Sequence, residues 1–584
     1  MNNPNQITYF AETNARGKKV KFGIKPKDRA RHVYVIGKTG TGKSTMLENM
    51  AIQDIHNGNG LCYMDPHGMT AEKLMEYIPE ERKKDVLYIA PFDMEHPVSF
   101  NIMEDVGYDK RHLVVGGLMS AFKKIWQDAW SARMEYILAN TMFALLEYPG
   151  ATLLSVNKML ADKAYRKKVV ANITDPSIKS YWEDEFAGYT DRFASEATPA
   201  IQNKVGQFTS NPLIRNIIGQ PKSSFDIREL MDQKKIIIVN LSKGRIGEAN
   251  ANLLGSLLVT KIYLSAMSRA DMSEKDLEDL PNFYLYVDEF QSFANESFAD
   301  ILSEARKYKL NLTIAHQYIE QMPEEVRDAV FGNVGTMITF RVGAYDAEVL
   351  EKEFAPTFTA EDIVNLGFAE IYLRLMIDGM GSKPFSARTM LPDIEPSHIK
   401  DEVVECSRKT FTKNRKEVEE VVKELIGITE NKNTNNDSGN NFKNKKPNTF
   451  NKSNNNSNNG FNKKTDNDPR RNNNQNKKQQ PIVEDNKNKM KEAFSGINIS
   501  KKELQKDTTP IEEARISLKE LKKPQNKKTV SSENRSSLKD ALAKAMRQPE
   551  KQNTDQEKKE VFTDSPTKDP AEIAEDKLKK MLEI

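Results

Sequence analysis

The segment from Val33 to Ser44 constrains the fold of this chain more than any other part of its sequence. A short apolar run, Val33 to Ile36, is followed by the pattern G-x-x-x-x-G-K-S from Gly37 to Ser44, and an apolar-periodic stretch begins at Met46. A glycine-rich loop with a buried strand before it and a helix after it is the P-loop unit of α/β proteins. The sequence therefore predicts an α/β fold built around this unit.

The loop has the chemistry of a phosphate-binding site. Its glycines let backbone N–H groups turn toward phosphate oxygens, and the helix N-terminus adds the positive end of its dipole. Lys43 is placed to reach the β and γ phosphates, and Ser44 to offer its hydroxyl to Mg2+. We therefore predict a site for ATP and Mg2+, formed by Gly37, Lys38, Thr39, Gly40, Thr41, Gly42, Lys43, Ser44 and Thr45.

A second apolar run, Phe283 to Val287, ends in two carboxylates, Asp288 and Glu289. A P-loop site needs such an acidic element on a neighbouring strand. We predict that Asp288 joins Ser44 in holding Mg2+, and that Glu289 orients and deprotonates the attacking water. An isolated Asp-Glu pair after a strand is more often a solvated helix start, and it is the P-loop that favours the catalytic interpretation.

Three further residues are candidates for the same reaction. Gln317 follows the strand-like run 312–315, where a sensor of the γ-phosphate or the water would lie. Arg306 lies on the helix before that run and Arg341 ends the next strand, so either is a candidate arginine finger for a neighbour's nucleotide. The alternatives are a glutamine that caps a loop and arginines that are merely on the surface.

Two more loops follow predicted strands. His67 in Asp65-Pro66-His67-Gly68 has no second metal ligand at a recognised spacing, so a structural role is expected. The loop Ser242 to Gly247 presents two cations, Lys243 and Arg245, that can meet phosphate of a nucleotide or of DNA.

The spacing of apolar residues changes twice along the chain. Strand-like runs occupy both flanks, whereas the middle has long amphipathic stretches such as 131–147 and 153–171. Later, Thr359 with Asp362 predicts a capping box. Residues 370–377 and 383–389 predict a closing hairpin, and residues 397–425 predict a helix. The predicted domains are a first part of the ATPase core at 1–104, an inserted all-α domain at 105–225, the second part of the core at 226–400, a C-terminal helix at 401–427 and a disordered tail at 428–584.

Composition supports the assignment of the tail. Hydrophobic residues make up 38% of the 584 residues and the mean hydropathy is −0.66, which is low for a fully packed chain of this length. Between Asn431 and Gln480, 20 of 50 residues are Asn, and 11 Lys or Arg against three Asp give a net charge of +8. Such a segment buries too little apolar surface to offset its chain entropy, so we expect a disordered tether whose short helical stretches bind another protein or none.

Cysteine usage and hydropathy bear on location. Cys62 and Cys406 are far apart, so neither a disulfide framework nor a zinc site is indicated, and a reducing cytoplasm fits. The sequence has no apolar run of 18 residues and no signal-peptide pattern, so we expect any membrane association to come through a partner.

Six blocks of sequence together resemble a known family. They are GKTGTGKST, MDPHGM, VNLSKGRIGE, YLYVDEFQSFA, ARKYKLNLTIAHQY and FGNVGTMITFRVG. Their order and separations are similar to those of type IV secretion coupling proteins of the TraG/TraD kind, within the HerA/FtsK class of motor ATPases. The resemblance spans roughly residues 19–408.

The resemblance implies a RecA-like motor with an inserted all-helical domain, assembled as a hexameric ring that moves DNA with ATP. By position it implies that Arg306 is the arginine finger in trans, Gln317 the sensor and Arg341 a further arginine near the nucleotide. Coupling proteins usually begin with a transmembrane pair, which this sequence lacks. It is therefore expected either to be recruited by a membrane or secretion-channel partner, or to act as a HerA/FtsK-like cytoplasmic DNA translocase. A nucleotide-gated adaptor that recruits proteins is the remaining alternative.

Overall fold

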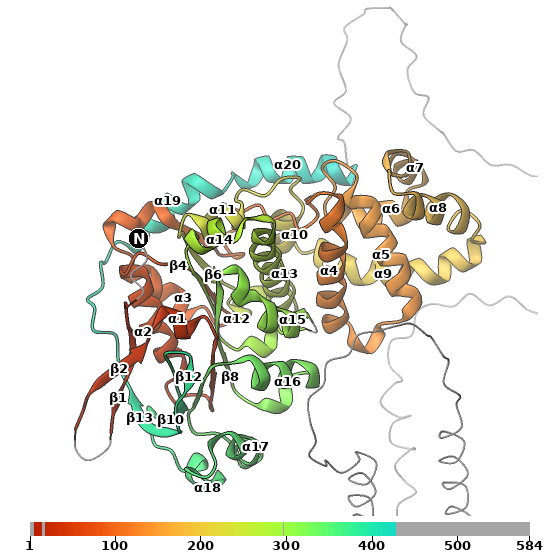
Figure 1. Cartoon of the computed structure of the whole chain (residues 1–584). Coiled ribbons are helices and arrows are strands. Elements are labelled where there is room, and N and C mark those ends of the chain that lie inside the picture. The colour runs from red at the N-terminus through yellow and green to blue at the C-terminus, as the bar shows by residue number, and fades with distance from the viewer. Residues whose placement is uncertain (1–4, 15–17, 105, 296, 428–584) are drawn as a thin grey trace, which may run out of the picture. The chain divides into compact units, whose positions relative to one another are not determined.

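A large mixed sheet forms the centre of the fold (Figure 1). The computed structural model describes residues 5–14, 18–104, 106–295 and 297–427, and the predicted tail lies outside them. The strands of the main sheet are β1 Thr8–Thr13, β2 Lys21–Ile24, β3 Val33–Ile36, β4 Gly60–Asp65, β5 Val86–Ile89, β6 Ile236–Asn240, β7 Phe283–Val287, β8 Leu310–His316, β9 Thr336–Thr339, β10 Glu370–Arg374 and β13 Phe385–Thr389. Their order is β2-β1-β13-β10-β9-β3-β8-β7-β4-β6-β5.

The strands from β9 to β5 in this order run parallel to one another. Nearly all of their residues are buried, as expected for parallel strands that helices cover on both faces. The predicted runs 33–36 and 283–287 match β3 and β7 residue for residue. The predicted α/β fold with a parallel P-loop core is therefore confirmed.

Helices surround the sheet and fill the middle of the chain. Those outside the middle segment are α1 Pro26–Arg29, α2 Lys43–His56, α3 Met69–Leu74, α11 Ile227–Asp232, α12 Lys243–Ile246, α13 Glu248–Met267, α14 Glu274–Asp279, α15 Ser297–Glu304, α16 Glu324–Asn333, α17 Ala344–Phe354, α18 Ala360–Val364, α19 Lys400–Phe411 and α20 Arg415–Ile426. Those of the middle segment are α4 Arg111–Ile125, α5 Ala132–Leu146, α6 Leu154–Ala161, α7 Lys163–Asn172, α8 Pro176–Ser180, α9 Asp191–Thr209 and α10 Pro212–Ile218.

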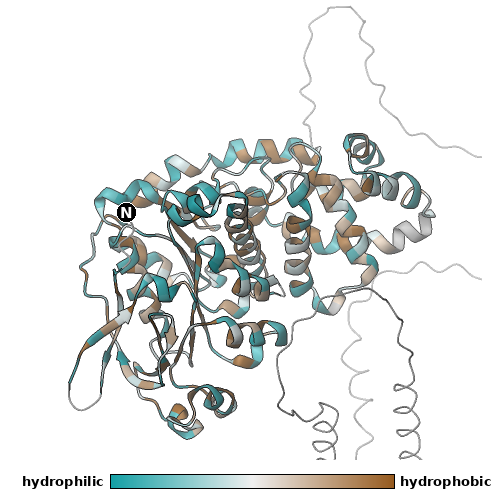
Figure 2. Ribbon diagram, in the orientation of Figure 1, coloured by the Kyte–Doolittle hydropathy of each residue, from teal (hydrophilic) through white to brown (hydrophobic). Residues whose placement is uncertain are grey.

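Two hydrophobic cores lie on the two faces of the sheet. Alternate residues of a strand point to opposite faces, so Val33 and Val35 of β3 pack with α2 while Tyr34 and Ile36 belong to the other core. That second core continues without interruption into α4, α5 and α13. In Figure 2 the strands at the centre of the fold are drawn mostly in the brown of hydrophobic residues. The middle segment therefore shares its core with the sheet.

The middle segment, which we call the helical segment and define as residues 106–220, holds no strand among its described residues. The amphipathic stretch 153–171 is divided between two helices, α6 and α7. Asp162 separates them: its carboxylate accepts hydrogen bonds from the N–H groups of Ala164 and Tyr165, at 2.8 and 3.1 Å. Asp162 is thus an N-cap that starts a new helix. The domain boundaries at 105 and 225 stay a prediction.

The last elements of the described chain are partly as predicted. Thr359 and Asp362 form a capping box, and β10 pairs with β13 in the expected hairpin, whose tip carries the short strands β11 Met376–Ile377 and β12 Met380–Gly381. The single helix predicted at 397–425 is wrong. Asn414 ends the break between α19 and α20 as an N-cap that accepts from the N–H of Lys416 at 3.0 Å.

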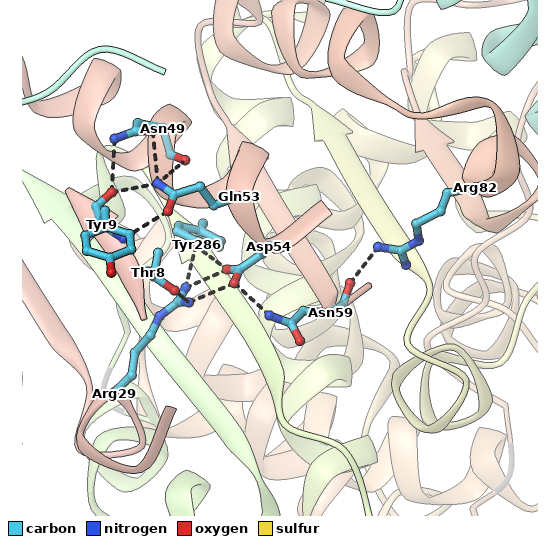
Figure 3. A network of polar contacts seen from close by, with 9 residues as sticks. All are labelled: Thr8, Tyr9, Arg29, Asn49, Gln53, Asp54, Asn59, Arg82 and Tyr286. Carbon is cyan, nitrogen blue, oxygen red and sulfur yellow. Dashed lines mark hydrogen bonds and ion pairs between the residues drawn. The ribbon is translucent and has the colours of Figure 1, made fainter. Parts of the chain in front are cut away.

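A buried ion pair lies between the P-loop helix and the sheet (Figure 3). The guanidinium of Arg29 donates to both carboxylate oxygens of Asp54 on α2, at 2.9 and 2.8 Å. The hydroxyl of Tyr286 on β7 accepts from Arg29 and donates to Asp54 at 2.5 Å. Arg29 and Asp54 are fully buried, so the pair fixes α2 relative to the strand that carries the acidic residues.

Candidate active site

The P-loop connects β3 to α2 at the carboxyl edge of the parallel strands. Gly40 and Gly42 have φ values of 74° and 114°, a region that favours glycine. A Cβ on Gly37 would lie 2.5 Å from the Cβ of Phe340, so this position also excludes a side chain. The loop therefore keeps its backbone free of side chains where phosphate oxygens would approach.

Lys43 is buried at the start of α2. Its Nζ donates to the carbonyl oxygens of Gly37 and Lys38, at 2.6 and 3.2 Å, so the side chain folds back over its own loop. Burial lowers the pKa of Lys43, and the nearby carboxylates of Glu289 and Asp288 oppose that shift. An ammonium that is bonded here only to neutral carbonyl groups fits the negatively charged phosphates of a nucleotide.

Ser44 and Asp288 meet although 244 positions separate them. The hydroxyl of Ser44 donates to a carboxylate oxygen of Asp288 at 2.7 Å. Asp288 is only 3% exposed, and this burial raises its pKa to about 6, while the bond from Ser44 opposes the rise. A buried carboxylate beside a hydroxyl is the oxygen donor set that Mg2+ prefers, so these two residues fit the predicted metal.

Glu289, the residue after Asp288, has an unusual backbone conformation and two side-chain amide partners. Its φ is 49°, which is uncommon for a residue with a side chain and often marks a functional position. One carboxylate oxygen accepts from Nε2 of Gln317 at 2.5 Å and the other from Nε2 of Gln291 at 2.7 Å. The hydroxyl of Thr39 donates to Oε1 of Gln317 at 3.0 Å. A polar chain from Thr39 to Gln291 thus links the P-loop to the acidic strand.

The two candidate arginines lie at different edges of the sheet. Arg341 follows β9 beside the P-loop, where its carbonyl oxygen accepts from the N–H of Lys38 at 2.8 Å, and its side chain is exposed. Arg306 is also exposed but precedes β8, so it lies at the amino edge, away from the P-loop of the same chain. Arg306 therefore does not line its own chain's site.

The other two loops make contacts of their own. Asp65 uses both carboxylate oxygens to bond the N–H groups of His67 and Ala71, while the side chain of His67 is exposed. Lys243 donates to the hydroxyl of Ser292 at 2.9 Å, and the guanidinium of Arg245 lies 3.6 Å from the centre of the Phe92 ring. In this structure both cations are engaged within the protein.

Sequence reasoning missed two residues that hold the turn after Glu289. Gln291 bonds Glu289 as described, and Lys124 on α4 donates from Nζ to the carbonyl oxygens of Gln291 and Ala294. The sequence could have pointed to Gln291, because it lies two positions after Glu289. Lys124 is 167 positions from Gln291, and no local pattern marks it.

No helix among the described residues combines the length and the apolar character that crossing a bilayer requires.

The chain is similar to one known family and to several solved structures. The family model described as Type IV secretory system Conjugative DNA transfer matches residues 5–344. Plasmid coupling protein TrwB in complex with ADP and Mg2+ shares 14% identity, over 68% of this chain and 99% of that chain, with a TM-score of 0.48. VirB4 of Thermoanaerobacter pseudethanolicus shares 12% identity over 68% and 99%, with a TM-score of 0.46. No curated protein matches the chain in sequence.

Proposed function

Since the chain belongs to the type IV secretory system family of conjugative DNA transfer proteins, its site is that of a P-loop ATPase in a type IV secretion-like DNA-translocating motor, and we propose how its own residues run that motor. The roles below concern the binding of ATP and Mg2+, the hydrolytic step and the assembly of subunits.

The P-loop from Gly37 to Thr45 binds the phosphates of ATP, and Lys43 moves from its own carbonyl groups to the β and γ phosphates. Ser44 and Asp288 hold Mg2+, which when bound neutralises charge on those phosphates. Glu289 accepts the proton of the attacking water. Gln317 reports on the γ-phosphate, because it bonds both Thr39 and Glu289.

The bond between Ser44 and Asp288 carries this proposal. It joins the P-loop to the acidic strand at 2.7 Å and so brings the two halves of a hydrolytic site together. Glu289 is held by Gln317 and Gln291 in this structure. Each of its carboxylate oxygens accepts one of these bonds and keeps a further lone pair, so Glu289 can accept a hydrogen bond from a water while both glutamines hold it in place.

Arg306 acts on the nucleotide of a neighbouring subunit. Its exposure and its position at the amino edge of the sheet support a role in trans, which requires a ring of subunits, and we propose a hexamer. Arg341 stays close to its own P-loop. DNA is the cargo, and a secretion-channel or membrane partner recruits the cytoplasmic ring to the membrane periphery. The predicted tail is the candidate segment for binding that partner.

Steady-state ATP hydrolysis by the full chain, with and without DNA, tests the proposal. We expect DNA to stimulate turnover, and Lys43→Ala and Glu289→Gln each to reduce it by at least about a hundredfold. Glu289→Gln retains ATP binding, whereas Lys43→Ala weakens it. If the rate of ATP hydrolysis is the same with and without DNA, the result contradicts the proposed motor and favours a nucleotide-gated adaptor.

A further inference from the structure

A cavity of about 1160 Å³ lies where α4 of the helical segment meets α13. Its lining comes from four stretches of the chain, 101–114, 146–151, 221–228 and 261–271. The two helices lie side by side (Figure 1), and next to the cavity they touch, since a Cβ on Gly117 would lie 2.3 Å from Cγ2 of Thr260. The volume slightly exceeds that of usual small-molecule sites, roughly 300–1,000 Å³, so the cavity has room for an organic ligand.

Apolar side chains from both helices line this cavity. Leu113 of α4 and Leu264 and Met267 of α13 belong to the lining, and each is only partly buried. Phe225 also lines it, and its ring stacks on that of Phe100 with the ring centroids 6.1 Å apart. A ligand with an apolar body would cover these side chains and leave water itself, which favours its binding.

One amine of the lining has donor capacity to spare. Lys261 of α13 is partly buried, and none of the described residues forms a hydrogen bond or an ion pair with its Nζ. Burial lowers the pKa of Lys261, and the charges of Glu104 and Asp226 oppose that shift. Glu104 is engaged elsewhere, because its two carboxylate oxygens accept from the N–H and the hydroxyl of Ser223, both at 2.7 Å. The ammonium of Lys261 can therefore donate to an anionic ligand.

Carboxylates in the same lining limit the charge of that ligand. Asp109, Asp226 and Asp271 line the cavity and are exposed, and Lys110 pairs with Asp271. These carboxylates repel a ligand with two negative charges more than a ligand with one. A single carboxylate therefore suits the cavity better than a phosphate group.

We infer that this cavity binds a fatty acid, with its carboxylate on Nζ of Lys261 and its alkyl chain against the apolar side chains of α4 and α13. Lys43, Ser44 and Asp288 are not part of the lining, so the inference does not depend on ATP hydrolysis. The bound chain touches α4, the helix from which Lys124 holds the turn after Glu289. The site is thus connected to the candidate active site through α4.

Calorimetric titration of the full chain with three ligands tests this site. The ligands are decanoate, decanol and decyl phosphate, which share an alkyl chain and differ in the head group. We expect decanoate to bind about tenfold more tightly than either of the others, as for one charge-assisted hydrogen bond. Lys261→Met should remove that advantage and leave decanol unchanged, whereas Lys261→Arg should keep most of it. Lys222→Met, which removes an exposed lysine of the same lining, should change none of the three affinities.

A second variant tests the apolar walls. Leu264→Gln should weaken decanoate and decanol alike, and circular dichroism verifies that each variant keeps its fold. The site is overturned if decanoate does not bind, if decanol or decyl phosphate binds as tightly as decanoate, or if Lys261→Met leaves the affinity for decanoate unchanged. Equal weakening of decanoate by Lys222→Met and Lys261→Met would overturn it too, because general attraction to positive charge would then explain the binding.

Discussion

The carboxyl edge of the parallel sheet and the helical segment share one hydrophobic core, but they meet the candidate active site in different ways. The sheet edge supplies Lys43, Asp288 and Gln317 directly to the site. The helical segment reaches it through Lys124, which bonds the backbone of the turn after Glu289. Helices that touch no nucleotide can therefore still influence hydrolysis, because they hold the turn that carries Gln291.

Lys124 is suited to a permanent contact of this kind. Burial lowers its pKa to about 7, and the nearby charge of Lys243 adds to the shift. A neutral amine still has two N–H groups, and Lys124 has two carbonyl partners, those of Gln291 and Ala294. The contact can therefore persist whether or not Lys124 carries its proton.

The largest expected effect concerns the opposite face of the sheet, where Arg29 and Asp54 pair beneath α2. Arg29→Met leaves Asp54 buried without its cation, so we expect the free energy of unfolding to fall by about 3–5 kcal/mol. The three tryptophans, Trp126, Trp130 and Trp182, all lie in the helical segment. Because the core is continuous, the urea midpoint from tryptophan fluorescence should fall together with that from far-ultraviolet circular dichroism.

A surface variant provides the control for this measurement. Arg327→Met removes an arginine that pairs with Glu324 and Asp328 on the exposed side of α16, and both midpoints should stay in place. If Arg29→Met lowers the dichroism midpoint but not the fluorescence midpoint, the two regions unfold separately and the shared core does not couple them.

A smaller effect tests the contact of the helical segment with the turn. Lys124→Met removes both hydrogen bonds, so we expect kcat for ATP to fall roughly tenfold, or about 1.4 kcal/mol in activation free energy, with little change in KM. Steady-state kinetics measure both constants, and Lys124→Arg should restore part of the loss.

Lys110→Met is the matched control for that variant. Lys110 also joins the helical segment to the rest of the chain, through an ion pair with Asp271, but at an exposed position away from the turn. Equal losses of kcat in the two variants would mean that any loosening of the helical segment slows turnover. That outcome would contradict a specific role for Lys124.

The smallest expected effect is confined to the helical segment. Asp162→Ala removes the N-cap of α7, so the amides of Ala164 and Tyr165 should exchange with solvent faster, while kcat stays unchanged. Hydrogen exchange followed by mass spectrometry measures the first effect, and Asp162→Ser should largely reverse it. A fall in kcat would show that even the far helices influence the site.

The same two regions differ in how far the sequence could predict them. The strands that carry the site are apolar runs buried on both faces, so β3 and β7 were predicted residue for residue. The helices of the segment were predicted from amphipathic periodicity, which continues through Asp162 although its side chain caps a new helix. The same cause merged α19 and α20 across Asn414.

The contacts within the site also divide into those that the local sequence could predict and those that it could not. Ser44 and Asp288 were predicted to cooperate because the P-loop and the acidic pair each follow a buried strand at one sheet edge, and the hydroxyl of Ser44 lies 2.7 Å from a carboxylate oxygen of Asp288. The bonds of Lys124 and of the pair Arg29 and Asp54 join positions whose local sequence carries no motif. Only the packing of distant elements brings these side chains together.

Movement along DNA is the central claim, and displacement of a triplex-forming strand from duplex DNA measures it most directly. The full chain with ATP and Mg2+ should displace the strand, whereas Glu289→Gln with ATP, or the unchanged chain with a non-hydrolysable ATP analogue, should not. Displacement by Glu289→Gln at the rate of the unchanged chain, or DNA-stimulated hydrolysis without any displacement, would contradict the account.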